Sequence, residues 1–229
     1  MLTLYDLAGA QSERRFSPYC WRIRLALAHK GLAVETIPWR FVDKEALAFS
    51  GRARVPVLVH DGKSVTDSSV IANYLEETFA GTPTLFGGAH GRALTRMYAA
   101  LGDVLVGTVA RFVVLDVYEH IDAGDKPYFR QSREQHFGMP LEQVVADRDA
   151  RLPAFRDSLT SMRVTLKKQP FFGGDAPLYA DYALFGAFAW ARAISPYRLL
   201  EAADPVAQWR DRLLDAFGGL ARSAPGYDG

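Results

Sequence analysis

The sequence predicts an α/β plus all-α fold, in which a small mixed sheet with helices is followed by a helical bundle. Strand-like alternation and helical periodicity succeed one another over the first 81 residues, which is typical of a mixed unit. Beyond a stretch rich in Gly, Thr and Pro, only helical periodicity remains. We therefore expect a first domain at 1–81, a linker at 82–91 and an all-helical domain at 92–229.

Composition narrows the class of protein. The chain has 229 residues, of which 49% are hydrophobic and 23% charged, as in soluble globular proteins. A net charge of +1 argues against a dedicated nucleic-acid or membrane-surface binder. One cysteine excludes an intrachain disulfide and a Cys-rich metal site. With no signal-peptide pattern and no apolar run near 20 residues, we expect a cytoplasmic protein with no nucleic-acid or membrane partner and no metal.

The first half of the mixed unit begins with an alternating strand at 2–7 and a polar loop at 9–15. A helix is predicted from Pro18 to Lys30, where Gly31 is a typical stop. A second strand is predicted at 33–39. The segment 41–50 is expected to be a short helix or a loop.

The second half of the mixed unit is a hairpin and a helix. The β-branched run 55–59 reaches Asp61-Gly62, a strong hairpin signal, and returns through 64–66. Asp67 is placed to cap a helix over 68–79. Together these elements predict a sheet covered by helices.

The step into the first helix is a candidate anion site. Pro18 suits the first helical position, which makes Ser17 the N-cap residue. Unpaired backbone N–H groups and the positive end of the helix dipole meet there, so a phosphate, carboxylate or thiolate would be stabilised. An ordinary helix cap is the alternative for Ser17.

The all-helical part shows two long apolar stripes, which we interpret as the core of a bundle. The first contains Leu94, Met97, Leu101, Val104 or Leu105, Thr108, Phe112 and Leu115. The second contains Leu141, Val145, Arg148, Leu152, Phe155, Leu159, Met162 and Leu166, with a kink expected at Pro153.

Between the stripes lies the polar and aromatic segment 118–138, which lacks strong periodicity. A connection of this length inside a bundle is often functional. We consider two interpretations: a lid or wall over an aromatic substrate pocket, and a disordered surface loop.

Three motifs in order resemble the thioredoxin-like domain of serine-type cytosolic glutathione transferases, and the similarity extends over essentially the whole chain. They are the run 16–22 (FSPYCWR), Val55-Pro56, and Asp67-Ser68 ahead of a helix. The resemblance implies glutathione as cosubstrate, no permanently bound cofactor, and a homodimer.

The same resemblance implies roles for individual residues. Ser17 would activate the thiol, and Val55 would hydrogen-bond the cysteinyl backbone of glutathione beside a cis peptide at Pro56. Asp67 and Ser68 would hold the γ-glutamyl end, where a helix N-terminus favours a carboxylate. Arg54 is the candidate for the glycyl carboxylate, and Arg52, Arg40 and Trp39 stay open alternatives.

The motif S-P-Y-C also resembles the C-P-Y-C of glutaredoxins with the first cysteine replaced by Ser17. No second cysteine is present to complete a disulfide, and Cys20 shares a helix face with Ile23 and Leu27. We therefore expect Cys20 to pack in the core. The serine hydroxyl is too weak an acid to be ionised near neutral pH, so it cannot take the proton of a thiol. Ser17 would instead donate a hydrogen bond to the glutathione thiolate.

A second motif of this family is similar to the run 171–182, which would cap a buried helix over 181–194. Leu178 stands where the family commonly has Ser or Thr, so the reciprocal capping box with Asp181 is expected to be incomplete. A last helix is predicted from Asp204 to Phe217.

The residues of these motifs are also similar to those of bacterial β-aryl etherases and their fungal relatives. Those enzymes use glutathione thiolate to cleave an aryl ether α to a carbonyl. Three functions are therefore considered. The first is a transferase acting on a hydrophobic, aromatic electrophile, with etherase activity as one form. The others are a glutathione-dependent reductase using Cys20 and a non-catalytic binding or regulatory protein of the same fold.

Overall fold

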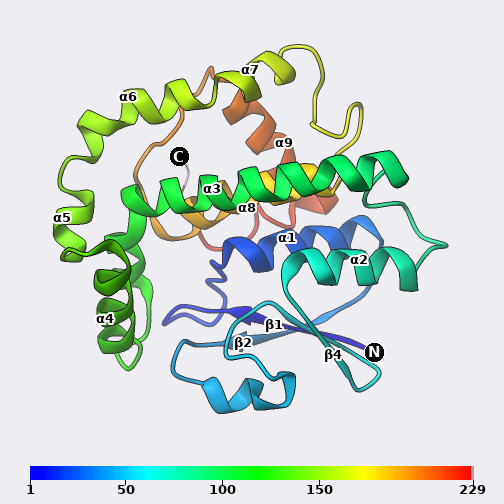
Figure 1. Ribbon diagram of the computed structural model, residues 1–229, viewed down its shortest axis with the longest axis horizontal. Coiled ribbons are helices and arrows are strands. Elements are labelled where there is room, and N and C mark those ends of the chain that lie inside the picture. The colour runs from blue at the N-terminus through cyan, green and yellow to red at the C-terminus, as the bar shows by residue number, and fades with distance from the viewer. Residues whose placement is uncertain (228–229) are drawn as a thin grey trace.

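The computed structural model describes residues 1–227 and shows a four-stranded mixed sheet with helices, followed by helices alone (Figure 1). The predicted fold class is confirmed. The first part contains β1 (Leu2–Leu7), α1 (Pro18–His29), β2 (Glu35–Trp39), η1 (Lys44–Ser50), β3 (Val57–His60), β4 (Lys63–Thr66) and α2 (Ser68–Thr78). The second contains α3 (Ala89–His120), α4 (Lys126–Phe137), α5 (Leu141–Val145), α6 (Arg148–Ser158), α7 (Thr160–Leu166), α8 (Tyr179–Ile194) and α9 (Pro205–Gly219).

The sheet has the strand order β2-β1-β3-β4. Strand β1 runs parallel to β2 and antiparallel to β3, and β3 pairs antiparallel with β4. The predicted hairpin turn is present, with Asp61 at φ 48° and Gly62 at φ 81°. Two consecutive positive φ angles are what a type I′ turn requires, and glycine meets that requirement without steric cost.

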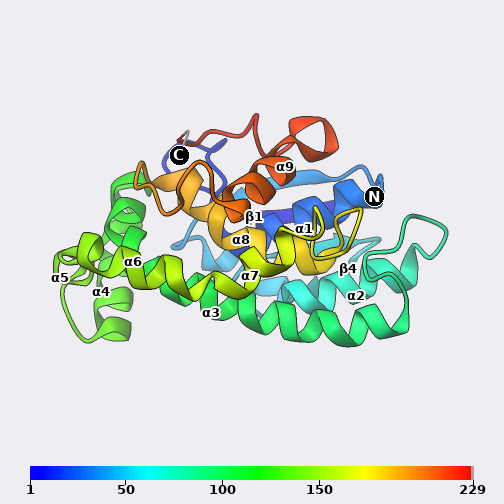
Figure 2. The same cartoon turned by 90° about the horizontal axis from the view of Figure 1, so that it is seen from above.

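The helices form layers above the sheet. Helices α1 and α2 cover one face, while η1 lies on the opposite side (Figure 1). Helix α8 packs against both α1 and α3, and α6 and α7 run alongside α3 (Figure 2). This stacking brings the start of α1 close to the long helix of the second part.

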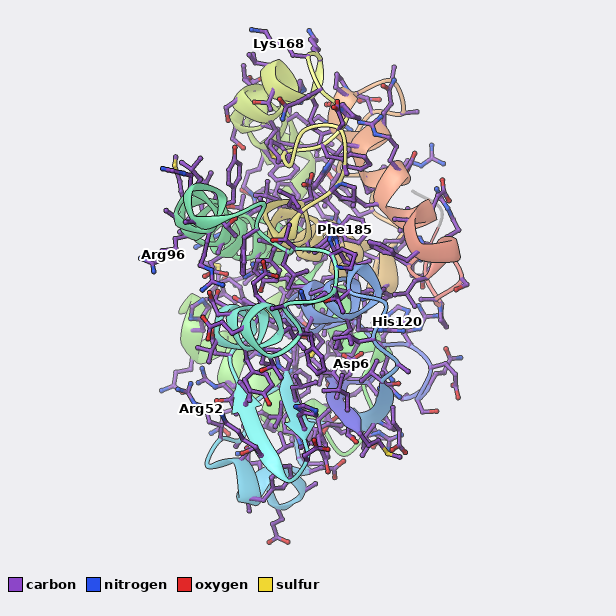
Figure 3. All side chains as sticks on the ribbon, turned by 90° about the vertical axis from the view of Figure 1, so that its right-hand side faces the viewer. Asp6, Arg52, Arg96, His120, Lys168 and Phe185 are labelled. Atoms are coloured by element: carbon purple, nitrogen blue, oxygen red, sulfur yellow. The ribbon has the colours of Figure 1, made fainter. Side chains whose placement is uncertain are left out.

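Helix α8 is the central element of the helical part. Fifteen of its 16 residues are buried, and Figure 3 shows Phe185 in the interior. The Asp181 carboxylate accepts N–H groups from Phe172 (2.7 Å), Gly173 (2.9 Å), Leu178 (3.0 Å) and the Trp209 indole (2.9 Å). Leu178 offers no hydroxyl in return, so the reciprocal box is incomplete, as predicted.

The predicted core role of the first stripe is wrong at its N-terminal end. Leu94, Met97, Leu101 and Val104 are 63%, 66%, 44% and 67% exposed. In this half of α3 the buried residues are Thr95, Gly102 and Leu105, because that face of the helix meets α8. Farther along the stripe, Phe112 is buried, as expected, and Leu115 is half-buried.

Two other boundaries differ from the predictions. Helix α3 begins at Ala89, inside the predicted linker 82–91. The segment 118–138 is not an irregular connection, because α3 continues to His120 and 126–137 form α4. The second stripe is divided into α5, α6 and α7, with interruptions before Arg148 and at Leu159, and Pro153 lies inside α6.

The connection between α2 and α3 is held by a buried ion pair. The Lys30 ammonium, which is completely buried, lies 3.0 Å from a Glu76 carboxylate oxygen and donates to Pro83 O (3.0 Å). Glu76 also accepts the Leu85 N–H (2.9 Å) and the Thr84 hydroxyl. We call this set the linker clasp. Among the described residues, no helix is long and apolar enough to cross a membrane.

Candidate functional site

A cavity of about 540 Å³ lies between the sheet and the helical part. The sheet side contributes Ser17 and Tyr19 from the start of α1 and Arg54 and Val55 from the loop before β3. Its opposite side consists of residues of α3, α4 and α8. Several of these are apolar: Val106, Ala110, Val114, Val117, Phe129, Phe137 and Trp190. We call this space the central cavity.

Ser17 caps α1 and lines the central cavity. Its backbone is extended (φ −63°, ψ 124°), Pro18 occupies the first helical position, and Ser17 Oγ accepts the Cys20 N–H at 3.2 Å. The bond uses a lone pair of the hydroxyl and does not use its hydrogen. A hydroxyl at this point can therefore donate to an anion beside the positive end of the α1 dipole.

Cys20 does not line the central cavity, and its packing role is confirmed by its complete burial. Its sulfur lies 4.0 Å from Tyr5 O on the neighbouring strand. Burial, with the nearby Asp6 carboxylate adding to it, raises the pKa of the Cys20 thiol well above its usual value. A thiolate is therefore disfavoured at Cys20, which is the opposite of what an attacking cysteine needs.

The loop before β3 carries the second group of predicted residues. The Val55-Pro56 peptide bond is cis, as the resemblance implied. Val55 lines the central cavity, whereas Pro56 is buried behind it. Arg54 also lines the cavity and is exposed. Among the described residues, Arg54 has no hydrogen-bonding or ion-pair partner.

The alternatives to Arg54 are less suitably placed. Trp39 lines the central cavity, but its indole N–H donates to Asp43 O at 2.7 Å. Arg40 lies 3.6 Å from an Asp122 carboxylate oxygen, and Arg52 is exposed outside the cavity lining. Arg54 is therefore the cation of this group that is open to a ligand in the cavity.

Asp67 and Ser68 lie at the N-terminus of α2 and are not among the residues that line the central cavity. Burial raises the pKa of the cavity residue Tyr19, and the Asp103 and Asp67 carboxylates add to this rise. Asp67 Oδ1 already accepts the N–H groups of Ser69 (2.9 Å) and Val70 (3.1 Å).

The Asp67 cap changes which donors are free at the N-terminus of α2. Ser68 is buried, and its carbonyl accepts the Tyr179 hydroxyl at 2.8 Å. Within residues 1–227, the N–H and hydroxyl of Ser68 have no hydrogen-bond partner. Ser68 therefore offers the open donors, whereas the next two N–H groups do not.

Arg22 and Asp103 are site residues that sequence reasoning missed. Arg22 is buried, and its Nη1 lies 2.9 Å from Asp103 Oδ1 on α3. Its guanidinium carbon lies 4.7 Å from the centre of the Tyr19 ring. Asp103 lines the central cavity. A charged side chain on the buried face of the first helix was the available signal, but the position of its partner could not be read from the sequence.

The segment 118–138 supplies a wall of the central cavity. Tyr128, Phe129, Arg133, His136 and Phe137 of α4 line it. The lid-or-wall interpretation is therefore consistent with the structure, and the surface-loop alternative is wrong. Helix α4 is held against the loop after β2, since Asp125 Oδ1 accepts the Val42 N–H at 3.0 Å.

Comparisons with known proteins agree with this arrangement. Residues 12–83 match the family model described as "Glutathione S-transferase, N-terminal domain", and residues 93–217 match "Glutathione S-transferase, C-terminal domain". The chain belongs to the glutathione S-transferase family. Among curated glutathione S-transferases it is 30% identical to a probable member from rice, covering 86% of this chain and 80% of the relative. A probable tobacco member is 30% identical, covering 73% of this chain and 64% of the relative.

Solved glutathione S-transferase structures share the fold. A fungal structure from Ceriporiopsis subvermispora, in complex with glutathione, matches with a TM-score of 0.83 at 22% identity over 98% of both chains. Glutathione transferase GSTFuA3 from Phanerochaete chrysosporium matches with a TM-score of 0.74 at 23% identity, over 93% of this chain and 95% of that one. Family membership and the curated relatives support glutathione transferase function for this chain.

Proposed function

We propose that this glutathione S-transferase uses Ser17 to stabilise glutathione thiolate for attack on a hydrophobic, aromatic electrophile. One observation carries the proposal. Ser17 stands at the N-terminus of α1, its capping bond does not use its hydroxyl hydrogen, and it lines a cavity whose opposite wall contains aromatic side chains. The only cysteine is buried away from this cavity.

Glutathione would lie along the sheet side of the central cavity. In this pose the Val55 backbone hydrogen-bonds the cysteinyl unit, and the Arg54 guanidinium pairs with the glycyl carboxylate. The N–H and hydroxyl of Ser68 donate to the γ-glutamyl carboxylate, and the Asp67 carboxylate pairs with the γ-glutamyl ammonium. Charge-assisted hydrogen bonds of this kind are stronger than neutral ones.

The catalytic effect of Ser17 is to lower the pKa of the bound thiol. A hydrogen bond donated to the sulfur favours its anionic form, and the dipole of α1 acts in the same direction. The proton of the thiol leaves to solvent, and the thiolate then attacks the electrophile. Because the apolar wall excludes water, the thiolate is less solvated and more reactive.

A β-aryl ether carrying an α-carbonyl is the electrophile that the motif resemblance favours. The thiolate would form a C–S bond at the alkyl carbon of the ether, and the bond from that carbon to the aryloxy oxygen would break. The phenolate leaves with the electron pair and takes a proton from water. A halogenated nitroaromatic is the alternative substrate class within the same function.

Three organisational features are part of the proposal. The chain divides into a thioredoxin-like glutathione-binding domain at 1–81, a predicted linker at 82–91 whose last residues already belong to α3, and a helical domain at 92–229. It forms a homodimer, for which the exposed face of α3 is the candidate surface. It works in the cytoplasm, where thiols such as Cys20 stay reduced.

Calorimetry and turnover test the proposed function together. We expect glutathione to bind in the calorimeter below millimolar concentration, and chlorodinitrobenzene or a β-aryl ether ketone to be conjugated. Faster turnover of the ether ketone, with release of the phenol, would establish etherase activity. Absence of glutathione binding at millimolar concentration would contradict the proposal and favour the non-catalytic alternative. Disulfide reduction that is lost in Cys20→Ser would favour the reductase.

A further inference from the structure

We infer that the electrophile of this enzyme carries an anionic group, and that Arg133 on α4 binds it. The inference rests on the proposed transferase function and names the class of its second substrate. Arg133 lines the central cavity together with Ser17, on the wall opposite the sheet. It would be a specificity-determining residue for an acidic aromatic compound such as an aryl carboxylate.

The guanidinium of Arg133 is held in place by aromatic rings and has no acidic partner. Its central carbon lies 5.0 Å from the centre of the Phe129 ring and 5.7 Å from that of Phe41. Its one hydrogen bond goes to Ser132 Oγ at 3.2 Å. Over the part of the chain that the structure describes, no carboxylate pairs with it. Its other N–H groups are therefore available to a ligand.

Two other arginines of the helical part, Arg130 and Arg148, are paired with carboxylates. Arg130, one turn earlier on α4, lies 2.8 Å from Glu134 and 2.8 Å from Glu142. Arg148 lies 3.3 Å from Asp116. Burial lowers the pKa of Arg133; Tyr128 opposes this effect, and the nearby Arg54 adds to it. An arginine that is desolvated, faces a second cation and lacks a counter-charge is stabilised by a bound anion.

The charges around the central cavity support a second anion site. Its lining contains the cations Arg54 and Arg133, and also His136, whereas its one carboxylate, Asp103, is already paired with Arg22. Arg54 precedes Val55 on the sheet side and is the proposed partner of the glycyl carboxylate. Arg133 stands within the aromatic wall, over the rings of Phe129 and Phe41. An aromatic ring bearing a carboxylate could pack against the aromatic side chains while its carboxylate pairs with the Arg133 guanidinium.

A pair of electrophiles that differ in charge tests the inference. We would use chlorodinitrobenzoate, with chlorine para to the carboxylate, and the corresponding neutral benzamide. In both, the thiolate forms a C–S bond at the chlorine-bearing carbon, and chloride leaves with the electron pair. Each kcat/KM is divided by the uncatalysed rate constant of the same compound, which removes their different intrinsic reactivities.

We expect the wild-type enzyme to favour the benzoate by about tenfold, the value of one charge-assisted hydrogen bond. Arg133→Met should remove this preference, leave the benzamide rate within about twofold, and keep the KM for glutathione. Arg133→Lys should retain part of the preference, since it retains the charge. The matched control is Arg96→Met on α3, which removes an exposed arginine on the outside of the molecule (Figure 3) and should behave as wild type.

Each other outcome overturns the inference in a recognisable way. Equal rates for the two compounds in the wild type would show that no anion is recognised. A raised KM for glutathione in Arg133→Met, with both electrophiles affected alike, would assign Arg133 to glutathione. An equal loss of the preference for the benzoate in Arg96→Met would assign that preference to the overall charge of the protein. If neither compound were conjugated, the proposed transferase function itself would fail.

Discussion

At the scale of the residue, the account depends on what Ser17 does with its hydroxyl. As the N-cap, Ser17 accepts one backbone N–H, and this fixes the orientation of the oxygen at the start of α1. This bond does not use its own hydrogen. A cap and a hydrogen-bond donor to a thiolate are thus two uses of one group, so the two interpretations of Ser17 considered from the sequence are compatible.

At the scale of the element, the linker clasp joins α1, α2 and the start of the second part. Burial alone would raise the pKa of Glu76, but hydrogen bonds from Leu85, Thr84 and Lys30 together lower it below its usual value. The folded state therefore favours the carboxylate. Its contribution to stability is complete above the unfolded pKa of 4.5 and is lost as the pH falls through the lower folded value.

We predict that Glu76→Gln lowers the free energy of unfolding at neutral pH by about 3 kcal/mol, because it leaves the buried Lys30 ammonium without a counter-charge. Urea unfolding at neutral pH and at acid pH measures this, and the variant should lose less stability than wild type on acidification. Glu77→Gln is the matched control, since Glu77 pairs with Arg92 on the surface and its side chain is 65% exposed. Its loss should stay within about 1 kcal/mol. Equal losses in the two variants would contradict the role of the clasp.

The elements also show what the sequence could and could not predict. Local signals sufficed for the Ser17 and Asp67 caps, the Asp61-Gly62 turn and helix α8, because short-range geometry determines each of them. The helical state of 126–137 was missed, since its aromatic and charged residues do not form an apolar stripe. Its position beside the sheet depends on contacts across the fold.

Long-range partners were equally beyond the sequence. The pairing of Arg22 with Asp103 joins α1 to α3, and only the packed structure brings them together. The occupation of the Ser69 and Val70 N–H groups by Asp67 was also not anticipated, although the cap itself was. As a result, the sequence grouped these residues into one predicted site, whereas the division of donors among them came from the structure.

At the scale of the whole molecule, α3 exposes a row of apolar side chains on its outer face. Leu94, Met97, Leu101 and Val104 border a groove of about 680 Å³ that α6 and α7 complete. An apolar surface of this kind on a soluble protein commonly marks an interaction site. A second copy of the chain is the occupant that we propose.

We predict a dimer in sedimentation at micromolar concentration and a monomer for Met97→Glu/Val104→Glu. Charges buried in the interface should weaken association by about thirtyfold or more. Val164→Glu is the matched control, because Val164 is 53% exposed on α7 but does not line the groove. A wild-type monomer at this concentration, or equal effects of the two sets of changes, would contradict a dimer through α3.

The pKa of the thiol of bound glutathione tests the central claim most directly. It is measured by titrating the ultraviolet absorbance of the thiolate in the complex, with the spectrum of the free protein subtracted. The account predicts a pKa about one to two pH units below that of free glutathione in the wild type and in Cys20→Ser, and a return toward the free value in Ser17→Ala. An unchanged low pKa in Ser17→Ala, or its loss in Cys20→Ser, would contradict the account.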